Sequence, residues 1–156
     1  MWARGDQAGA LATYRAALAI TEKVAATIEE TEISRTGASG METASAKYGV
    51  ARFALLARDF GKALAASNRA RALAPEPLWP DSTRAHALMF LKRTSEAREL
   101  YLAHKGHGNW EKLIAEDYRE MREAGLSNPM MAQIESALSL APAPARQRTS
   151  GRREGK

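Results

Sequence analysis

The sequence predicts an all-α protein, and three observations lead to that prediction. Residues with capping oxygens stand just ahead of segments whose apolar residues recur at helical spacing: Asp6, Asp59, Asp81, Asn109 and Ser127. Stretches rich in glycine or proline, which rarely continue a helix, separate these segments. Apolar and polar residues nowhere alternate with the two-residue period of a strand. Helices without a sheet are therefore expected.

Three helices are expected in the first half of the chain. The first covers residues 6–28 and ends before ISRTGASG, whose glycines favour a turn. The second covers residues 42–57. The third covers residues 60–73, in the stretch DFGKALAASNRARALAP, where six of seventeen residues are alanine. Alanine forms helix readily but offers little apolar area to bury, so another helix is expected to approach this one closely.

Four helices are expected in the second half. The proline-rich APEPLWP precedes helices over residues 82–91 and 95–104, and KGHGN precedes helices over 110–124 and 129–140. The helix over 110–124 carries an apolar stripe opposite a charged face, a pattern typical of a helix with one buried side: Trp110, Leu113, Ile114, Tyr118 and Met121. We expect it to cap one end of the protein, and the last helix to close over the same end.

Composition limits the function classes. The chain has 156 residues and no cysteine, which excludes disulfides and thiolate chemistry. The formal charge is +5, but residues 146–156 carry five basic residues against one glutamate, so +4 lies in this tail and only +1 elsewhere. A basic groove for nucleic acid is therefore not expected. No apolar run is long enough for a membrane span, and the chain is expected to be soluble and cytoplasmic.

An internal repeat predicts the architecture. Ala63 aligns with Ala97 and Ala51 with Ala85, both at an offset of 34 residues. The first helix repeats the third at an offset of 53, which aligns Ala10 with Ala63 and indicates an insertion near residues 31–41. A period of 34 with two helices per unit is typical of stacked helical repeats.

On these residues the chain resembles tetratricopeptide-repeat proteins, and more closely the C-terminal end of large bacterial members with repeats of the type GDLAGALAAYRESLAI. The family's small-residue positions match Ala51, Ala63, Ala70, Ala85 and Ala97, and its terminal proline matches Pro75. The chain departs from the pattern at Lys47, Ser67, Arg84 and His104. The resemblance implies a right-handed α-solenoid of antiparallel helix pairs with C-terminal capping helices.

The expected organisation is one helical repeat domain over residues 1–140 and a disordered basic tail over 141–156. Within the domain we expect a half repeat at 5–30, an insertion at 31–41, repeats at 42–75 and 78–105, and capping helices at 109–140. The half repeat leaves the first helix without one neighbour. This indicates either that the chain is part of a longer array, or that it pairs with itself or with another protein through this helix. Packing on residues 42–57 alone is the simpler alternative.

The resemblance also implies a binding surface. In the family, first helices line a concave groove, and the matching positions are Ser45, Tyr48, Arg52, Leu55, Trp79, Ser82, His86 and Met89. This mixture suits a peptide or partner protein with some acidic character, so the expected function is a non-catalytic protein-interaction scaffold. The lysine and asparagine set of chaperone-binding members is missing. Three alternatives remain: a structural or regulatory segment of a larger bacterial protein whose active domain lies upstream, a groove that is merely solvated, and a weaker hypothesis in which the basic tail binds nucleic acid.

Candidates for chemistry are few. His104 and His107 are close in sequence but have no third ligand nearby, so a metal site is not expected there. His86 has no nucleophile or carboxylate in its own repeat, and a packed or groove-facing histidine is expected. The acidic segment 29–32 could take a divalent cation, although a solvated helix end is the ordinary interpretation. We therefore expect no catalytic residue, cofactor or metal.

Overall fold

The structure is a computed structural model that describes residues 4–140, and this part of the chain folds into seven α-helices without a strand. The prediction of an all-α protein is confirmed. The helices are α1 (Arg4–Thr36), α2 (Met41–Leu56), α3 (Phe60–Leu73), α4 (Trp79–Phe90), α5 (Thr94–Ala103), α6 (Trp110–Glu123) and α7 (Pro129–Ala137). The expected basic tail, 141–156, lies outside the described residues.

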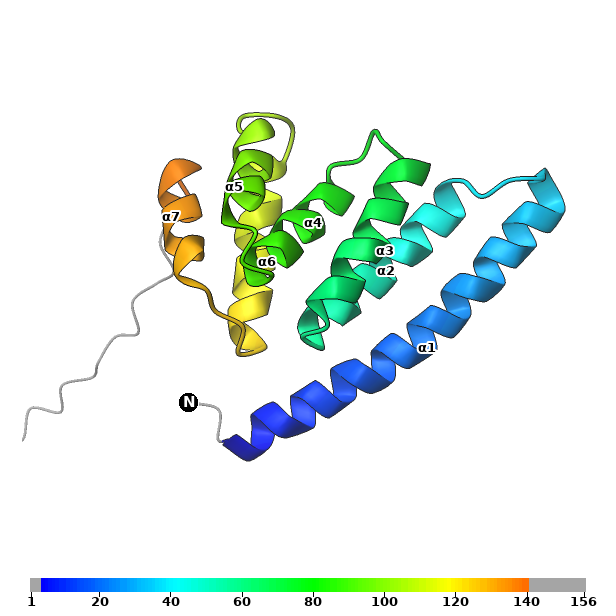
Figure 1. The fold of residues 1–156 in the computed structure, drawn as a ribbon, viewed down its shortest axis with the longest axis horizontal. Coiled ribbons are helices and arrows are strands. Elements are labelled where there is room, and N and C mark those ends of the chain that lie inside the picture. Colours follow the sequence, from blue (N-terminus) through cyan, green and yellow to red (C-terminus); the bar gives the residue numbers. More distant parts are fainter. Residues whose placement is uncertain (1–3, 141–156) are drawn as a thin grey trace, which may run out of the picture.

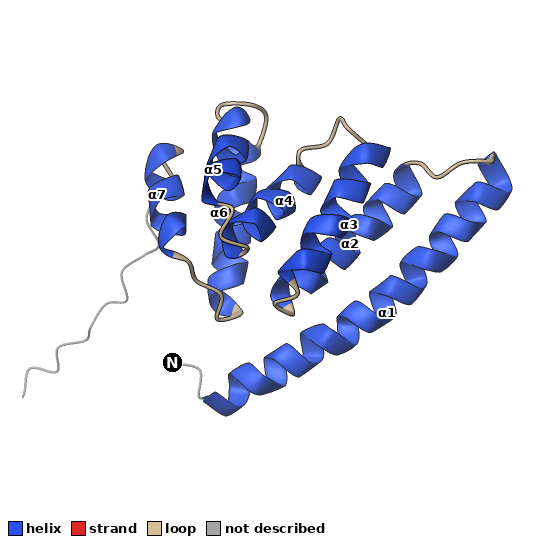
Figure 2. Cartoon of the chain, in the orientation of Figure 1, coloured by secondary structure: helices blue, strands red, loops and turns tan. Residues whose placement is uncertain are grey.

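The helices are arranged as a row in which each of the first four packs on the next (Figure 1). Contacts also join helices two apart in the chain: α2 with α4, α4 with α6, and α5 with α7. Short loops connect the helices, as Figure 2 shows. The long helix α1 lies along one edge of the row, so only one of its flanks faces the other helices.

Helix α1 is longer than expected. The helix continues beyond its expected end at residue 28 to Thr36, into the insertion expected at 31–41, and Asp6 lies in the first turn instead of capping it. The segment EETEISRT contains neither glycine nor proline, so nothing in its backbone stops the helix. Gly37 does, because its φ of +81° lies in the left-handed region that glycine adopts at low cost.

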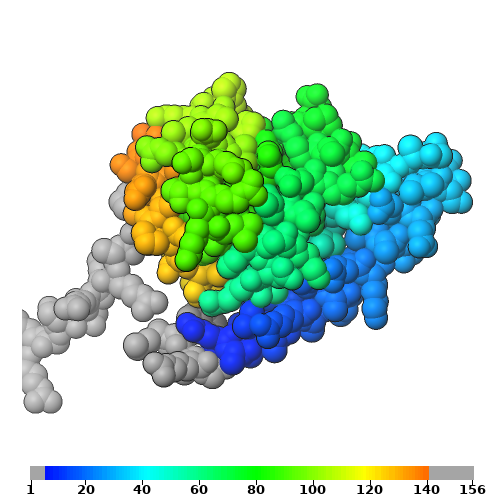
Figure 3. Space-filling view, in the orientation of Figure 1, coloured from blue at the N-terminus to red at the C-terminus, as the bar shows by residue number. Residues whose placement is uncertain are grey.

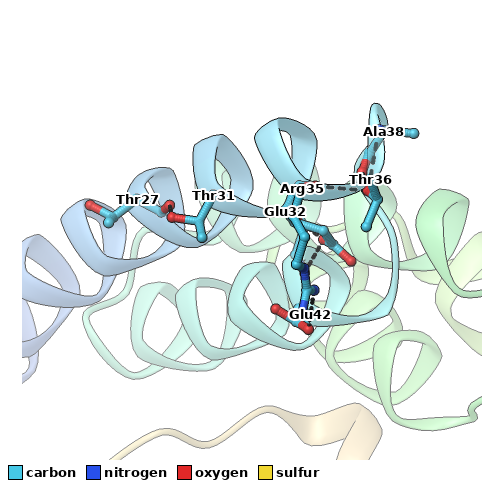
Figure 4. Close-up of polar contacts among 8 residues, drawn as sticks. Thr27, Thr31, Glu32, Arg35, Thr36, Ala38 and Glu42 are labelled. Carbon is cyan, nitrogen blue, oxygen red and sulfur yellow. Dashed lines mark hydrogen bonds and ion pairs between the residues drawn. The ribbon is translucent and has the colours of Figure 1, made fainter.

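The end of α1 is tied to the start of α2. Gly40, the residue before α2, has no side chain to cap it, and the carboxylate of Glu32 accepts from the backbone N–H of Thr43 at 2.9 Å and from its hydroxyl. A Cβ on Gly40 would lie 2.9 Å from Glu32 Oε1, so a larger residue at this position would displace the Glu32 carboxylate. Arg35 pairs with Glu42 next to it (Figure 4). These contacts explain why the helix extends to Thr36.

The predicted caps have mixed outcomes. Asp59 caps α3 by accepting from the backbone N–H of Lys62 at 3.1 Å, as expected. At α7 the acceptor is Asn128 instead of Ser127, and Asn109 makes no side-chain cap at α6. Helix α4 begins three residues earlier than expected, because Pro80 fits the first turn of a helix, and Asp81 is therefore inside the helix and buried.

The repeated alanines lie inside the protein. Ala51, Ala63, Ala85 and Ala97 are each 0% exposed, and so is Ala70. Larger side chains fill the core toward the C-terminal end, where Trp110, Tyr101, Tyr118 and Ile114 are fully buried. The core thus changes from small residues between α2 and α3 to aromatic residues around α5 and α6.

The turns after α2 and α4 repeat at the same offset of 34 residues. Arg58 and Lys92 both have left-handed backbones, with φ of 63° and 62°. The next residue donates in each turn to a carbonyl five positions back: Asp59 to Ala54 at 2.8 Å, and Arg93 to Leu88 at 3.0 Å. The sequence repeat is therefore accompanied by a repeat in backbone geometry.

Candidate functional site

The eight residues expected to line a groove lie on α2 and α4, and the structure divides them into two groups. Ser45 is exposed, and Tyr48, Arg52 and Trp79 are half-buried. The other four are buried: Leu55, Ser82, His86 and Met89. One part of the expected surface is therefore accessible, and the other part is covered.

The accessible part centres on two aromatic rings. The ring centroids of Tyr48 on α2 and Trp79 on α4 lie 4.6 Å apart, and the guanidinium of Arg52 lies 5.8 Å from the Tyr48 centroid. Burial raises the pKa of the Tyr48 hydroxyl, which therefore stays protonated and can donate or accept a hydrogen bond. We call Tyr48, Arg52 and Trp79 the aromatic shelf. Ser45 lies one turn before Tyr48 on the same helix.

Helix α6 covers the other part. A small cleft that includes Leu55 and His86 is closed on one side by Asp117, Glu120 and Met121 of α6. Glu120 forms an ion pair with Arg52, so α6 reaches the margin of the shelf. The capping helix predicted from the sequence thus lies over a part of the surface that was expected to bind a ligand.

His86 belongs to a buried polar network. Its Nε2 lies 2.9 Å from Oδ2 of Asp117 and its Nδ1 lies 2.6 Å from the Tyr101 hydroxyl. With Nε2–H donating to the carboxylate, Nδ1 accepts from the hydroxyl. Tyr118 lies against the His86 ring, at 5.5 Å between centroids, and burial raises the pKa of Tyr101. Both nitrogens of His86 are engaged and the side chain is 1% exposed, so the network supports packing between α4, α5 and α6 and gives a substrate no access.

Sequence reasoning missed Asp117 as the partner of His86, because it searched for a carboxylate only within the same repeat. A signal was present. Asp117 stands three residues after Ile114 and four before Met121, so it lies on the buried stripe of α6. An acidic residue on an apolar stripe indicates a buried partner.

Asp81 organises a second buried polar cluster. Its Oδ2 lies 2.7 Å from Nε2 of His104 and 3.0 Å from Nη1 of Arg71. His104, considered above as a metal ligand, is therefore bonded to a carboxylate. In the acidic segment at 29–32, Glu29 pairs with Lys47 and Arg69. Residues 4–140 contain no group of three or more potential metal ligands.

A further concave region lies between two segments that are far apart in the sequence. A cavity of about 350 Å³ lies between the start of α1 and the end of α6, lined by Asp6, Gln7, Ala10, Tyr14, Glu120, Glu123, Ala124 and Gly125. Three carboxylates and the C-terminal carbonyls of α6 make it electronegative. Its two sides are more than a hundred residues apart in sequence, so no local pattern predicted it.

Comparison with known proteins adds no assignment. No family model, no curated protein and no solved structure matches this chain. None of the helices described here combines the length and hydropathy needed to cross a membrane.

Proposed function

We propose that this chain is a non-catalytic protein-interaction scaffold with tetratricopeptide-like helix pairing, and that it binds an acidic segment of a partner protein on the aromatic shelf. The observation that carries the proposal is the contact between Tyr48, Trp79 and Arg52 on a partly exposed surface. Tyrosine, tryptophan and arginine are the residue types most enriched among those that dominate binding energy at interfaces. Here all three lie side by side on two neighbouring helices.

The packing of the helices supports this proposal. The fully buried alanines let α2, α3, α4 and α5 approach closely, and the repeated turns at Arg58 and Lys92 give the two helix pairs the same backbone geometry. In such a stack the first helices of successive pairs lie next to each other, as α2 and α4 do. Rigid helices are suited to present a preformed surface, which lowers the entropic cost of binding.

The charge of the expected ligand follows from Arg52. Its guanidinium carries five N–H donors, and the ion pair with Glu120 uses only part of them. A ligand carboxylate next to Trp79 can therefore bind the remaining donors while an apolar ligand side chain packs on the two rings. This combination distinguishes an acidic peptide with an apolar anchor from a basic one.

The test is selection of a displayed random-peptide library on the whole chain, followed by fluorescence anisotropy of the recovered peptides. Trp79→Ala should weaken binding by about thirtyfold, the effect of a central interface residue. The matched control is Phe90→Ala on the same helix, because Phe90 also belongs to a half-buried aromatic pair, with Phe60 at 4.7 Å between ring centroids. Circular dichroism monitors the fold of both variants.

The outcome is decided by the comparison of these two variants. Peptides that bind wild type and Phe90→Ala equally but lose affinity for Trp79→Ala support the shelf. Peptides that bind Trp79→Ala as tightly as wild type would refute it, and so would a selection that recovers no peptide. Arg52→Glu is less informative, because the new carboxylate would face Glu120 and disturb the contact with α6.

A further inference from the structure

One face of α1 is exposed along most of the helix and carries no charge. Its residues are spaced three or four apart and all are exposed: Thr13, Ala16, Ile20, Val24, Thr27 and Thr31. Ile20 is 64% exposed and Val24 50%, the two most exposed large apolar side chains that the structure describes on α1. We call these six residues the outer face of α1.

The threonines of the outer face have no free hydroxyl donor, so a partner would mainly contact their methyl groups. The hydroxyls of Thr13, Thr27 and Thr31 each donate to the backbone carbonyl four residues earlier, at 3.0, 3.1 and 2.8 Å. Figure 4 shows Thr27 and Thr31 on α1 apart from the side chains that reach toward α2. Because its hydroxyl donors are already used, the outer face can contact another apolar surface without leaving unpaired donors.

The rest of the described chain leaves this face open. Helix α1 packs on α2 through a different flank, which includes the buried Leu18, Ala25 and Glu32. In the space-filling view α1 forms the margin of the molecule, with the other helices on one side of it (Figure 3). The outer face is therefore available to a partner.

Charges beside the outer face indicate which partner fits. Lys23 and Glu30 lie on the same edge of the face, two helical turns apart. Neither has an opposite charge three or four residues away, and within residues 6–140 neither forms an ion pair. Glu22 and Glu29, on the flank toward α2 and α3, are by contrast both paired with basic residues of those helices.

We propose that α1 pairs antiparallel with α1 of a second copy of this chain. A two-fold axis between antiparallel helices brings each edge against the same edge of the other copy, so that contacts occur in equal pairs. With the axis between residues 26 and 27, Lys23 of each copy faces Glu30 of the other. The same register sets Val24 against Thr27 and Thr31 of the second copy. A single register thus pairs the opposite charges and also brings the apolar groups of the two copies into contact.

Sedimentation velocity of the whole chain, from micromolar to millimolar concentration, tests this proposal. Wild type should show a concentration-dependent dimer. Lys23→Glu turns two attractive contacts into two repulsive ones and should weaken the dimer by roughly tenfold. Glu30→Lys should do the same, and the double variant that carries both changes should return to the affinity of wild type, because it restores opposite charges across the axis.

Two further variants separate the interface from general effects on the surface. Val24→Glu places a charge within the outer face and should abolish the dimer, whereas Leu91→Glu, at another exposed apolar residue, should leave it intact. Wild type that stays monomeric at all concentrations would overturn the proposal, and so would a dimer that survives Val24→Glu. A double charge swap that fails to restore dimerisation would overturn the antiparallel register. The outer face is distinct from the aromatic shelf, so either proposal can fail alone.

Discussion

Ala63→Leu tests whether the alanines allow the helices to approach closely. Ala63 on α3 is 0% exposed, and Ala51 and Ala54 on the facing helix α2 are equally buried. Leucine adds three carbon atoms, which would stabilise the protein by about 2.4 kcal/mol if there were room to bury them. A well-packed core has no such room, and the helices would have to move apart. Overpacking of this kind costs about 1 to 3 kcal/mol, so steric strain should exceed the gain from burial.

The matched control is Ala65→Leu, because Ala65 lies on the same helix and is exposed. Alanine and leucine have similar helix propensities, so this variant should change the free energy of unfolding by only a few tenths of a kcal/mol. Urea titrations and thermal unfolding, both followed by circular dichroism, measure the two variants. Ala63→Leu should lower Tm by about 2 to 12 °C at 2 to 4 °C per kcal/mol for a domain of this size. If Ala63→Leu proves as stable as Ala65→Leu, the helices are not limited by the size of this residue.

Two further changes test the contacts that fix helix ends. The hydrogen bond from the Thr43 hydroxyl is the largest cause that lowers the pKa of Glu32, from 4.5 to about 2. The ionised carboxylate therefore stabilises the fold fully above pH 4.5, and this stabilisation is lost as the pH falls toward 2. Urea titrations across this range should show that the stability of Glu32→Gln depends less on pH than that of wild type. Asp59→Ala removes an observed cap and should cost about 1 kcal/mol in the same assay, whereas Asn109→Ala removes no cap bond and should cost a few tenths at most.

Local patterns in the sequence predicted the helices well. The bounds of α3 agree with the prediction at both ends, because Asp59 caps its start and the residues toward Pro75 cannot continue it. The burial of Ala63 and Ala97 also followed from their spacing. The bounds of α3 depend on residues close in sequence, and the burial of the alanines follows a fixed period. Both kinds of pattern can be recognised in a single sequence.

Contacts between distant segments were not predictable in the same way. The end of α1 was placed too early, because Glu32 stabilises the helix through Thr43, a residue beyond the loop. The expected groove was treated as open, because nothing near Arg52 in sequence shows that Glu120 lies next to it. A sequence does not show which charged residues form ion pairs or hydrogen bonds between distant segments, since an acidic residue on a helix is usually solvated. The eight residues predicted to line a groove therefore lie on α2 and α4 as expected from their sequence positions, but fewer of them are accessible than the prediction assumed.

The ion pair between Arg52 and Glu120 connects the aromatic shelf to helix α6. The two side chains are 38% and 43% exposed, and exposed pairs of this kind contribute about 0 to 1 kcal/mol. Breaking the ion pair with Glu120 in favour of a ligand carboxylate at Arg52 therefore costs little free energy. Buried contacts, by contrast, keep α6 packed over Leu55 and His86. On the proposed function, a ligand carboxylate that binds the remaining donors of Arg52 competes with Glu120 for the guanidinium, and it does so without removing α6. Glu120→Gln, which keeps the shape but not the charge, should then strengthen binding of an acidic peptide, and weaker binding by this variant would show that Glu120 helps to hold the ligand.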